Sequence, residues 1–142
     1  KNFSSALAIL LCAAASAAQS IQIGEPADGT TVKSGTPLVV EVVRPDSLES
    51  STEVGVVISF ISCPNNACPS SANRLGTILY NGPYKPQFPN PNPNHLQPNQ
   101  NFRIHIPKGA KGKAQLIVTH FNLIGAGPAP NTETHSITLN VS

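Results

Sequence analysis

The sequence lacks several features that would narrow its function. It has neither methionine nor tryptophan, and only 11% of its 142 residues are charged, with a net charge of +2 at pH 7. So small a charge gives no electrostatic basis for binding nucleic acid or an anionic membrane. The length accommodates one domain. We therefore expect a single small domain with neither nucleic acid nor membrane as its partner.

Catalytic motifs are also missing. There is no G-x-S-x-G sequence of the kind that serine hydrolases carry, and the glycines before Pro128 lack the context of a nucleotide-binding fingerprint. A glycosidase would need two carboxylates about 5–10 Å apart. The seven acidic residues lie where we expect turns or solvent-facing positions: Glu25, Asp28, Glu41, Asp46, Glu49, Glu53 and Glu133. The sequence predicts a protein without enzymatic activity and without a cofactor.

The histidines give no clear metal-binding pattern. Neutral imidazoles are good ligands for copper and zinc, but the sequence has no H-x-H or H-E-x-x-H spacing. His105 and His120 could be neighbours on adjacent strands, whereas His95 and His135 are isolated. A copper site built on an N-terminal histidine fails, because the mature chain would begin with alanine or glutamine. We expect no metal site.

The first eighteen residues differ from the rest of the chain. Lys1 is followed by an apolar run over residues 6–15 and by the small-residue sequence A-S-A at 15–17, which is typical of a cleaved secretory signal. A membrane-spanning helix would need about 20 apolar residues, more than this run contains. We predict a signal peptide over residues 1–18, a single domain over residues 19–142, and a secreted, extracellular protein.

Cysteine usage agrees with that compartment. Cys12 would leave with the signal peptide, and the remaining pair is Cys63 and Cys68. A disulfide across so short a loop would stabilise the fold by roughly 2 kcal/mol. A redox or metal pair is the alternative, but four residues separate the cysteines and no second pair follows at zinc-like spacing. We predict a structural disulfide.

Alternating apolar and polar residues predict strands, and no segment has the period of an amphipathic helix. Turn signals separate seven strands, at residues 21–23, 38–44, 53–62, 74–80, 102–106, 114–122 and 134–141. We place 53–62 at the centre, because it is apolar on both faces, with Val54, Val56, Ile58 and Phe60 on one of them. This pattern predicts a β-sandwich of the immunoglobulin or fibronectin type III kind. A small barrel is the alternative.

A loop rich in proline and asparagine occupies residues 81–101. Its prolines favour an extended, surface-lying backbone. Tyr80, Tyr84 and Phe88 lie at its start, where they could stack on sugar rings or anchor a protein partner. They could equally hold the loop against the sheet, and the sequence does not separate these two roles.

Two further surface features are weaker. Lys108, Lys111 and Lys113 form a basic tip that could meet an anionic polysaccharide, although a solvated hairpin is the simpler interpretation. Asn140 begins an N-V-S glycosylation sequon at the end of the chain, where efficient modification is doubtful.

Four stretches together give a family resemblance: IQIGEPADGTTVKSGTPLVVEVVRP, EVGVVISFISC, LGTILYNGPYKPQF and HFNLIGAGPAPNTET. Over residues 21–141 the chain resembles the fungal necrosis-inducing secreted proteins, and in particular the small members found in basidiomycetes. The resemblance implies a virulence effector without catalysis, which suppresses plant immunity by binding immune receptor-type kinases. It assigns no contact residues. The opening strand, D-G-T turn and second strand are also similar to immunoglobulin-like, Ser/Thr-rich domains of fungal cell walls.

Two functions follow as hypotheses. The first is an effector that binds a protein target of the plant receptor-like kinase type. The second is a cell-wall or carbohydrate-binding module that uses Tyr80, Tyr84 and Phe88 to bind polysaccharide. In either case we expect a monomer.

Overall fold

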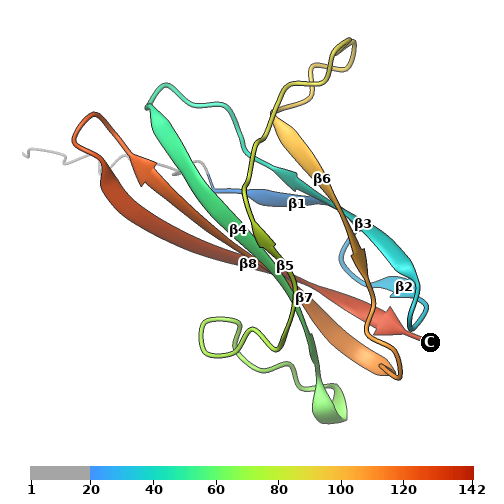
Figure 1. Cartoon of the computed structure of the whole chain (residues 1–142). Coiled ribbons are helices and arrows are strands. Elements are labelled where there is room, and N and C mark those ends of the chain that lie inside the picture. The colour runs from blue at the N-terminus through green and yellow to red at the C-terminus, as the bar shows by residue number, and fades with distance from the viewer. Residues whose placement is uncertain (1–19) are drawn as a thin grey trace, which may run out of the picture.

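In the computed structural model, which describes residues 20–142, two β-sheets pack face to face, and all but one of their strand pairings are antiparallel (Figure 1). The smaller sheet has three strands in the order β1-β3-β6, and the larger has five in the order β2-β8-β7-β4-β5. The strands are β1 (Gln22–Glu25), β2 (Thr30–Val32), β3 (Pro37–Val43), β4 (Ser51–Ser62), β5 (Thr77–Gly82), β6 (Asn99–His105), β7 (Gly112–Ile124) and β8 (Ala129–Val141). One short 3-10 turn, η1 (Pro64–Asn66), is the only helical element in this part of the chain.

The fold class predicted from the sequence, an all-β sandwich, is confirmed, whereas the immunoglobulin or fibronectin type remains a prediction. Eight strands replace the seven expected, because the short β2 runs parallel to the end of β8. The expected break over residues 125–130 is only a tight turn, and β8 begins at Ala129. Pro130 is part of that strand and lies opposite Leu123. It is tolerated there because β2 does not reach this end of β8, and prolines are accommodated at open sheet edges.

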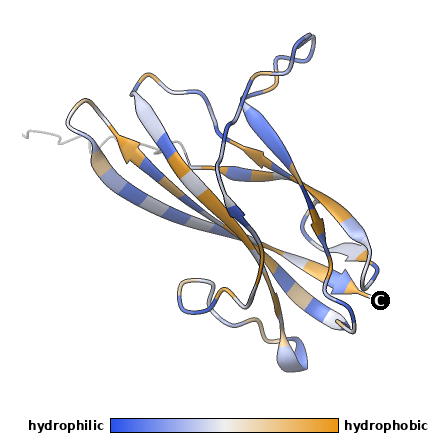
Figure 2. Cartoon of the chain, viewed as in Figure 1, coloured by the Kyte–Doolittle hydropathy of each residue, from blue (hydrophilic) through white to orange (hydrophobic). Residues whose placement is uncertain are grey.

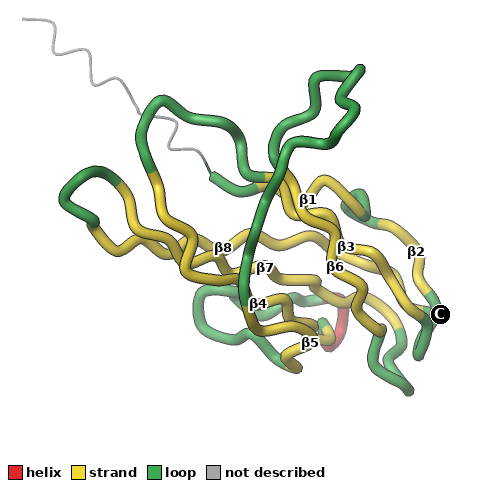
Figure 3. Tube along the Cα trace, turned by 45° about the horizontal axis from the view of Figure 1, so that its top comes forward, coloured by secondary structure: helices red, strands yellow, loops and turns green. Residues whose placement is uncertain are grey.

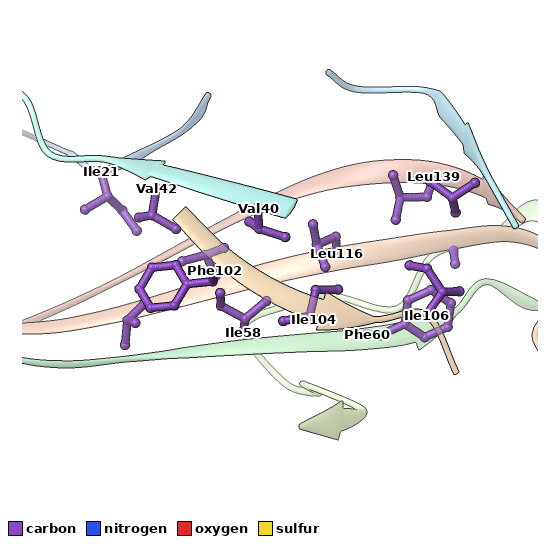
Figure 4. Close-up of a cluster of buried hydrophobic side chains, with 14 of the residues drawn as sticks. Ile21, Val40, Val42, Ile58, Phe60, Phe102, Ile104, Ile106, Leu116 and Leu139 are labelled. Carbon is purple, nitrogen blue, oxygen red and sulfur yellow. The ribbon is translucent and has the colours of Figure 1, made fainter. Parts of the chain in front are cut away.

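The core lies between the two sheets (Figure 4). Every second residue of the facing strands points inward, as the two-residue period of a strand requires. Figure 2 shows the resulting alternation of hydrophobic and hydrophilic bands, for example near the end of β8. The labelled core residues of Figure 4 come from both sheets and from the flanking segments: Ile21, Val40, Val42, Ile58, Phe60, Phe102, Ile104, Ile106, Leu116 and Leu139.

Two connections need separate description. Cys63 and Cys68 form a disulfide at the start of the connection from β4 to β5. Residues 83–98, which we call the strap, leave β5 and return into β6 after crossing the side of the sandwich (Figure 3). The strap corresponds to the predicted Pro/Asn-rich loop, although strands β5 and β6 extend further into that loop than expected. The predicted signal peptide, Cys12 included, lies outside the described residues. Over residues 20–142 no helix is long and apolar enough to cross a membrane.

Candidate functional site

His120 lies on the core-facing side of β7 and has no exposed surface. Its neighbours along that face, Val118 and Asn122, are also buried. An imidazole in such a place must find hydrogen-bond partners for both ring nitrogens, because a buried polar group without a partner is costly. The structure supplies two carboxylates, one from each strand beside β7.

The first carboxylate reaches His120 because of a β-bulge. Glu53 pairs with Asn122 and Gly55 pairs with Phe121, so Val54 is an extra residue on β4 with no partner on β7. The bulge shifts the alternation by one residue. Glu53 therefore faces the core, and 61% of Val54 is exposed. Without the bulge, regular alternation from the buried Val56 would turn Val54 toward the core and Glu53 toward solvent.

The second carboxylate comes directly across the β7–β8 ladder. Glu133 lies opposite His120, and its Oε1 is 2.9 Å from His120 Nδ1. The same oxygen accepts a hydrogen bond from the backbone N–H of Ile21 at 2.9 Å. On the other side of the ring, His120 Nε2 bonds Glu53 Oε2, and Arg44 Nη1 donates to Glu53 Oε1 at 2.9 Å. We call His120, Glu53, Glu133 and Arg44 the buried charge cluster.

The cluster is electrically balanced when His120 carries its proton, since two cations then face two carboxylates. Burial by itself disfavours the charged imidazole, but the hydrogen bonds that it donates to Glu133 and Glu53 outweigh this effect and raise the pKa of His120 to about 9. Burial would likewise raise the pKa of Glu53 and of Glu133. Hydrogen bonds from His120, with help from Arg44 or Ile21, keep the pKa of each carboxyl below its ordinary value. His120 is therefore an imidazolium at neutral pH, donating from both nitrogens.

This arrangement suits a structural role. Both nitrogens of His120 are engaged by carboxylates, and the ring has no exposed surface. Nor does the cluster offer a metal a place: among residues 20–142, no three or more His, Cys, Asp or Glu side chains are arranged to hold an ion. The cluster ties β4, β7 and β8 to the segments before β1 and after β3.

Sequence reasoning missed this cluster, and two of its expectations are corrected here. Glu53 and Glu133 were expected at turns or solvent-facing positions, but only 15% of each side chain is exposed, and both bind His120. His105 and His120 are not cross-strand neighbours. His105 lies on β6 in the small sheet, opposite Pro37, whereas His120 lies in the large sheet. The sequence did carry one signal of the cluster: Glu53 is a lone acidic residue in an otherwise apolar strand, two residues before Gly55.

The three predicted aromatic residues do not form one exposed platform. Tyr84 is 2% exposed, its ring contacts that of His120 edge-on, and its hydroxyl donates to the backbone oxygen of Val42 at 3.0 Å. Burial, together with the negative charge of Glu53, raises the pKa of Tyr84. Tyr80 is half-buried against Phe102. Only Phe88 stands free on the strap, and the tyrosines instead attach the strap to the sandwich.

The remaining predicted positions are scattered over the surface. Lys108 and Lys111 lie exposed in the turn between β6 and β7, and Lys113 is partly buried at the start of β7. His95 is exposed in the strap, and His135 lies on β8 with its Nε2 3.9 Å from Glu133 Oε2. Asn140 is exposed, and its side-chain nitrogen, the atom that a glycan would occupy, donates to the backbone oxygen of Gly29 at 3.0 Å.

A groove of about 350 Å³ lies away from His120, which is not among the residues that line it. Its walls are the end of β4, the start of β5 and the turn that follows β6: Phe60, Ile61, Ser62, Gly76, Thr77, Pro107, Lys108, Gly109 and Ala110. The groove contains no carboxylate, histidine or cysteine. Its only charged wall residue is Lys108, so it suits a partly apolar occupant with negative charge at its rim.

Comparison with known proteins adds the family. No curated protein matches this chain. The description of the Nis1 family, in contrast, fits residues 16–140, which is nearly the whole of the folded part described above. The match therefore spans both sheets, the disulfide and the strap. This chain belongs to the Nis1 family.

Proposed function

We propose that this chain is a secreted effector that acts without catalysis, by binding a host protein of the plant immune receptor-kinase type and suppressing defence. The observation that carries the proposal is the family match over residues 16–140. Membership of the Nis1 family is consistent with a secreted, effector-like protein. The disulfide between Cys63 and Cys68 supports secretion, because such bonds persist in oxidising compartments.

The geometry supports binding better than it supports chemistry. The most polarised side chains of the described region, those of the buried charge cluster, are used up in bonds to one another. The exposed features are of the kind that contact partners: an open groove, a strap bearing Phe88, and a free sheet edge with basic side chains. Such surfaces provide recognition without a reacting group.

The alternative, a carbohydrate-binding module, loses its main support. It needed three exposed rings, and Tyr84 is buried while Tyr80 is packed on Phe102. A single exposed ring, Phe88, is a weak platform for a polysaccharide. Co-sedimentation with cell-wall polysaccharide is therefore the matched negative control for the experiment below.

The test has two parts. The chain recovered from the medium of an expressing host is titrated against purified receptor-like kinases, and is separately expressed in leaves before an elicitor-triggered oxidative burst. We expect binding with a dissociation constant of about 10 µM or tighter, and a reduced burst. Absence of binding to any member of a kinase panel, together with an undiminished burst, would refute the proposal. Binding to polysaccharide alone would favour the alternative.

A further inference from the structure

The two sheets of the sandwich have four edge strands, and one of them is unguarded. Natural sheets protect their edges by short strands, bulges or covering segments. At three edges this is so: β2 has only three residues, and the pairings of β1 and β5 are both interrupted by irregularities. The fourth, β6, has seven residues and pairs with β3 in unbroken register. Of the four strands that end the two sheets, it is the longest with unbroken pairing (Figure 1).

The backbone direction along β6 follows from two hydrogen bonds. Ile106 N–H donates to Thr36 O, and Pro98 O accepts from Arg44, so these even-numbered residues direct their backbone groups toward β3. Because consecutive residues of a strand alternate in direction, odd-numbered residues direct theirs outward. Asn101, Arg103 and His105 therefore present N–H and C=O groups at the open edge. The backbone of these three has no hydrogen-bond partner on that side within residues 20–142.

The chain itself begins to fill this edge and then leaves it. Asn99, the next odd-numbered residue toward the start of β6, exchanges two backbone hydrogen bonds with Gln87 of the strap, at 3.0 and 3.1 Å. This antiparallel bridge ends there, and the strap crosses to β5, as Figure 3 shows. An extended segment already pairs with one residue of the edge, so the edge accepts a strand in this geometry. Next to the bridge, Lys85 N–H donates to the side chain of Gln100 at 2.7 Å and not to the backbone of β6. Within residues 20–142 the outward backbone groups of Asn101, Arg103 and His105 therefore stay unpaired and are left for another chain.

The charges at the edge specify what that chain carries. The side chains of Arg103 and His105 are exposed, and Lys108 follows just beyond the end of β6. Within residues 20–142 none of the three takes part in an ion pair. On the neighbouring strand β3, the acidic residue Glu41 lies opposite Asn101. A second copy of the chain, paired through the same edge, would bring its arginine close to Arg103 and be repelled.

The groove described above lies where an added strand would end. Pro107 and Lys108, which follow β6 directly, form one wall, and Phe60 and Thr77 form part of the other. Side chains of an added strand alternate between the two faces. One set would lie beside Arg103 and His105, and the other would turn toward the apolar interior and the groove.

We propose that the open edge of β6, residues 101–105 with the adjoining groove, binds an extended segment of a partner protein by strand addition, and that this segment alternates acidic and apolar side chains. Main-chain hydrogen bonds supply affinity in this mode and the alternating side chains supply specificity. The inference rests on the proposed function only in taking the chain to act by binding a protein.

The experiment uses a synthetic peptide that alternates glutamate and valine, added to the isotopically labelled, secreted chain. We expect backbone amide shifts in the NMR spectrum confined to β6, the groove and the bridge at Gln87. Two control peptides separate the contributions. The first alternates lysine and valine and should bind at least tenfold more weakly, because its charge is reversed. The second carries N-methyl groups on alternate residues, which remove the donors that face β6, and it should bind about tenfold more weakly.

A matched pair of variants tests the edge from the protein side. Arg103→Pro removes an N–H that points outward, so the ladder with β3 remains and the variant should melt close to the wild type. Arg103→Gln removes the charge but keeps the N–H. We expect a loss of more than tenfold in peptide affinity for Arg103→Pro and about threefold for Arg103→Gln. Should Arg103→Pro unfold the domain, the N-methylated peptide still tests the same hydrogen bonds.

Failure of this proposal and failure of the proposed function give different results. If the glutamate–valine peptide does not bind, or binds no better than the lysine–valine peptide, the basic side chains serve to guard the edge and the proposal is overturned, whatever kinase binding shows. If the chain binds a receptor-like kinase and Arg103→Pro binds it equally well, the function stands and the surface lies elsewhere. If the peptide binds at the edge but no kinase does, the edge site stands and the kinase target is wrong.

Discussion

Raising the pH from 6.5 to about 9 should destabilise the folded protein through one residue, His120. Its pKa is raised from an ordinary value of 6.5 to about 9 in the folded state. A raised pKa means that the folded state holds the proton more tightly than the unfolded state does. The resulting stabilisation is complete below pH 6.5 and is lost as the pH passes through about 9. At about 1.36 kcal/mol per pH unit, this difference in pKa is worth about 3 kcal/mol.

Two carboxyl groups set the lower limit of the pH range in which the protein is most stable. The pKa values of Glu53 and Glu133 lie below the ordinary 4.5, so their contribution is present above that pH and is lost as the pH falls through the lowered values. Stability should therefore be greatest between about 4.5 and 6.5 and decline on both sides.

Urea unfolding followed by far-UV circular dichroism measures the effect, since the chain has no tryptophan to report by fluorescence. The free energy of unfolding should fall by about 3 kcal/mol between pH 6 and pH 9.5. His120→Gln removes the titrating group, and it should be less stable at pH 6 and show no decline over this range. His105→Gln, a change at an exposed position of the small sheet, should keep the wild-type profile. A wild-type profile that is flat above pH 6.5, or an undiminished decline in His120→Gln, would refute the reasoning.

Three further changes test the packing around the cluster. Tyr84→Phe removes the hydroxyl that donates to Val42 O, so it should lower the free energy of unfolding in urea by about 1 kcal/mol and increase proteolytic cleavage of the strap. Cleavage equal to that of the wild type would contradict the anchoring role of Tyr84. Cys63→Ser with Cys68→Ser opens the disulfide and should cost about 2 kcal/mol in the same assay, and alkylation of the wild type without reductant should label neither cysteine. Phe102→Ala empties a position packed by both tyrosines and should cost about 3–5 kcal/mol, whereas a cost below about 1 kcal/mol would place this ring outside the core.

Much of the fold could be predicted from the sequence, because it depends on local patterns. Two-residue alternation located most strands, and the short spacing of Cys63 and Cys68 indicated their disulfide. Length was less predictable: β7 and β8 continue through a tight turn that proline and glycine content made look like a break. The short β2 was missed because three residues hold too little pattern, and its partner lies at the other end of the chain.

The buried charge cluster could not be predicted, and the reason is geometric. Whether Glu53 faces the core depends on a bulge of one residue at Val54, and nothing in alternation alone shows where a ladder gains a residue. The pairing of His120 with Glu133 depends on the register of a hairpin whose length was underestimated. The burial of Tyr84 was one of two roles left open, and only the path of the strap decides it.

The parallel pairing of β2 with β8 has a consequence for how the protein folds. The second strand of the fold finds its partner in the last, since Val32 lies opposite Val141 and Ser142 N–H donates to Val32 O. The larger sheet is therefore complete only when two segments far apart in the sequence have met. Contacts between such distant segments slow folding, so closure of the sandwich should be a slow step. If the chain is secreted as we propose, this topology prolongs the incompletely folded form, which is the form that can pass through a narrow export channel.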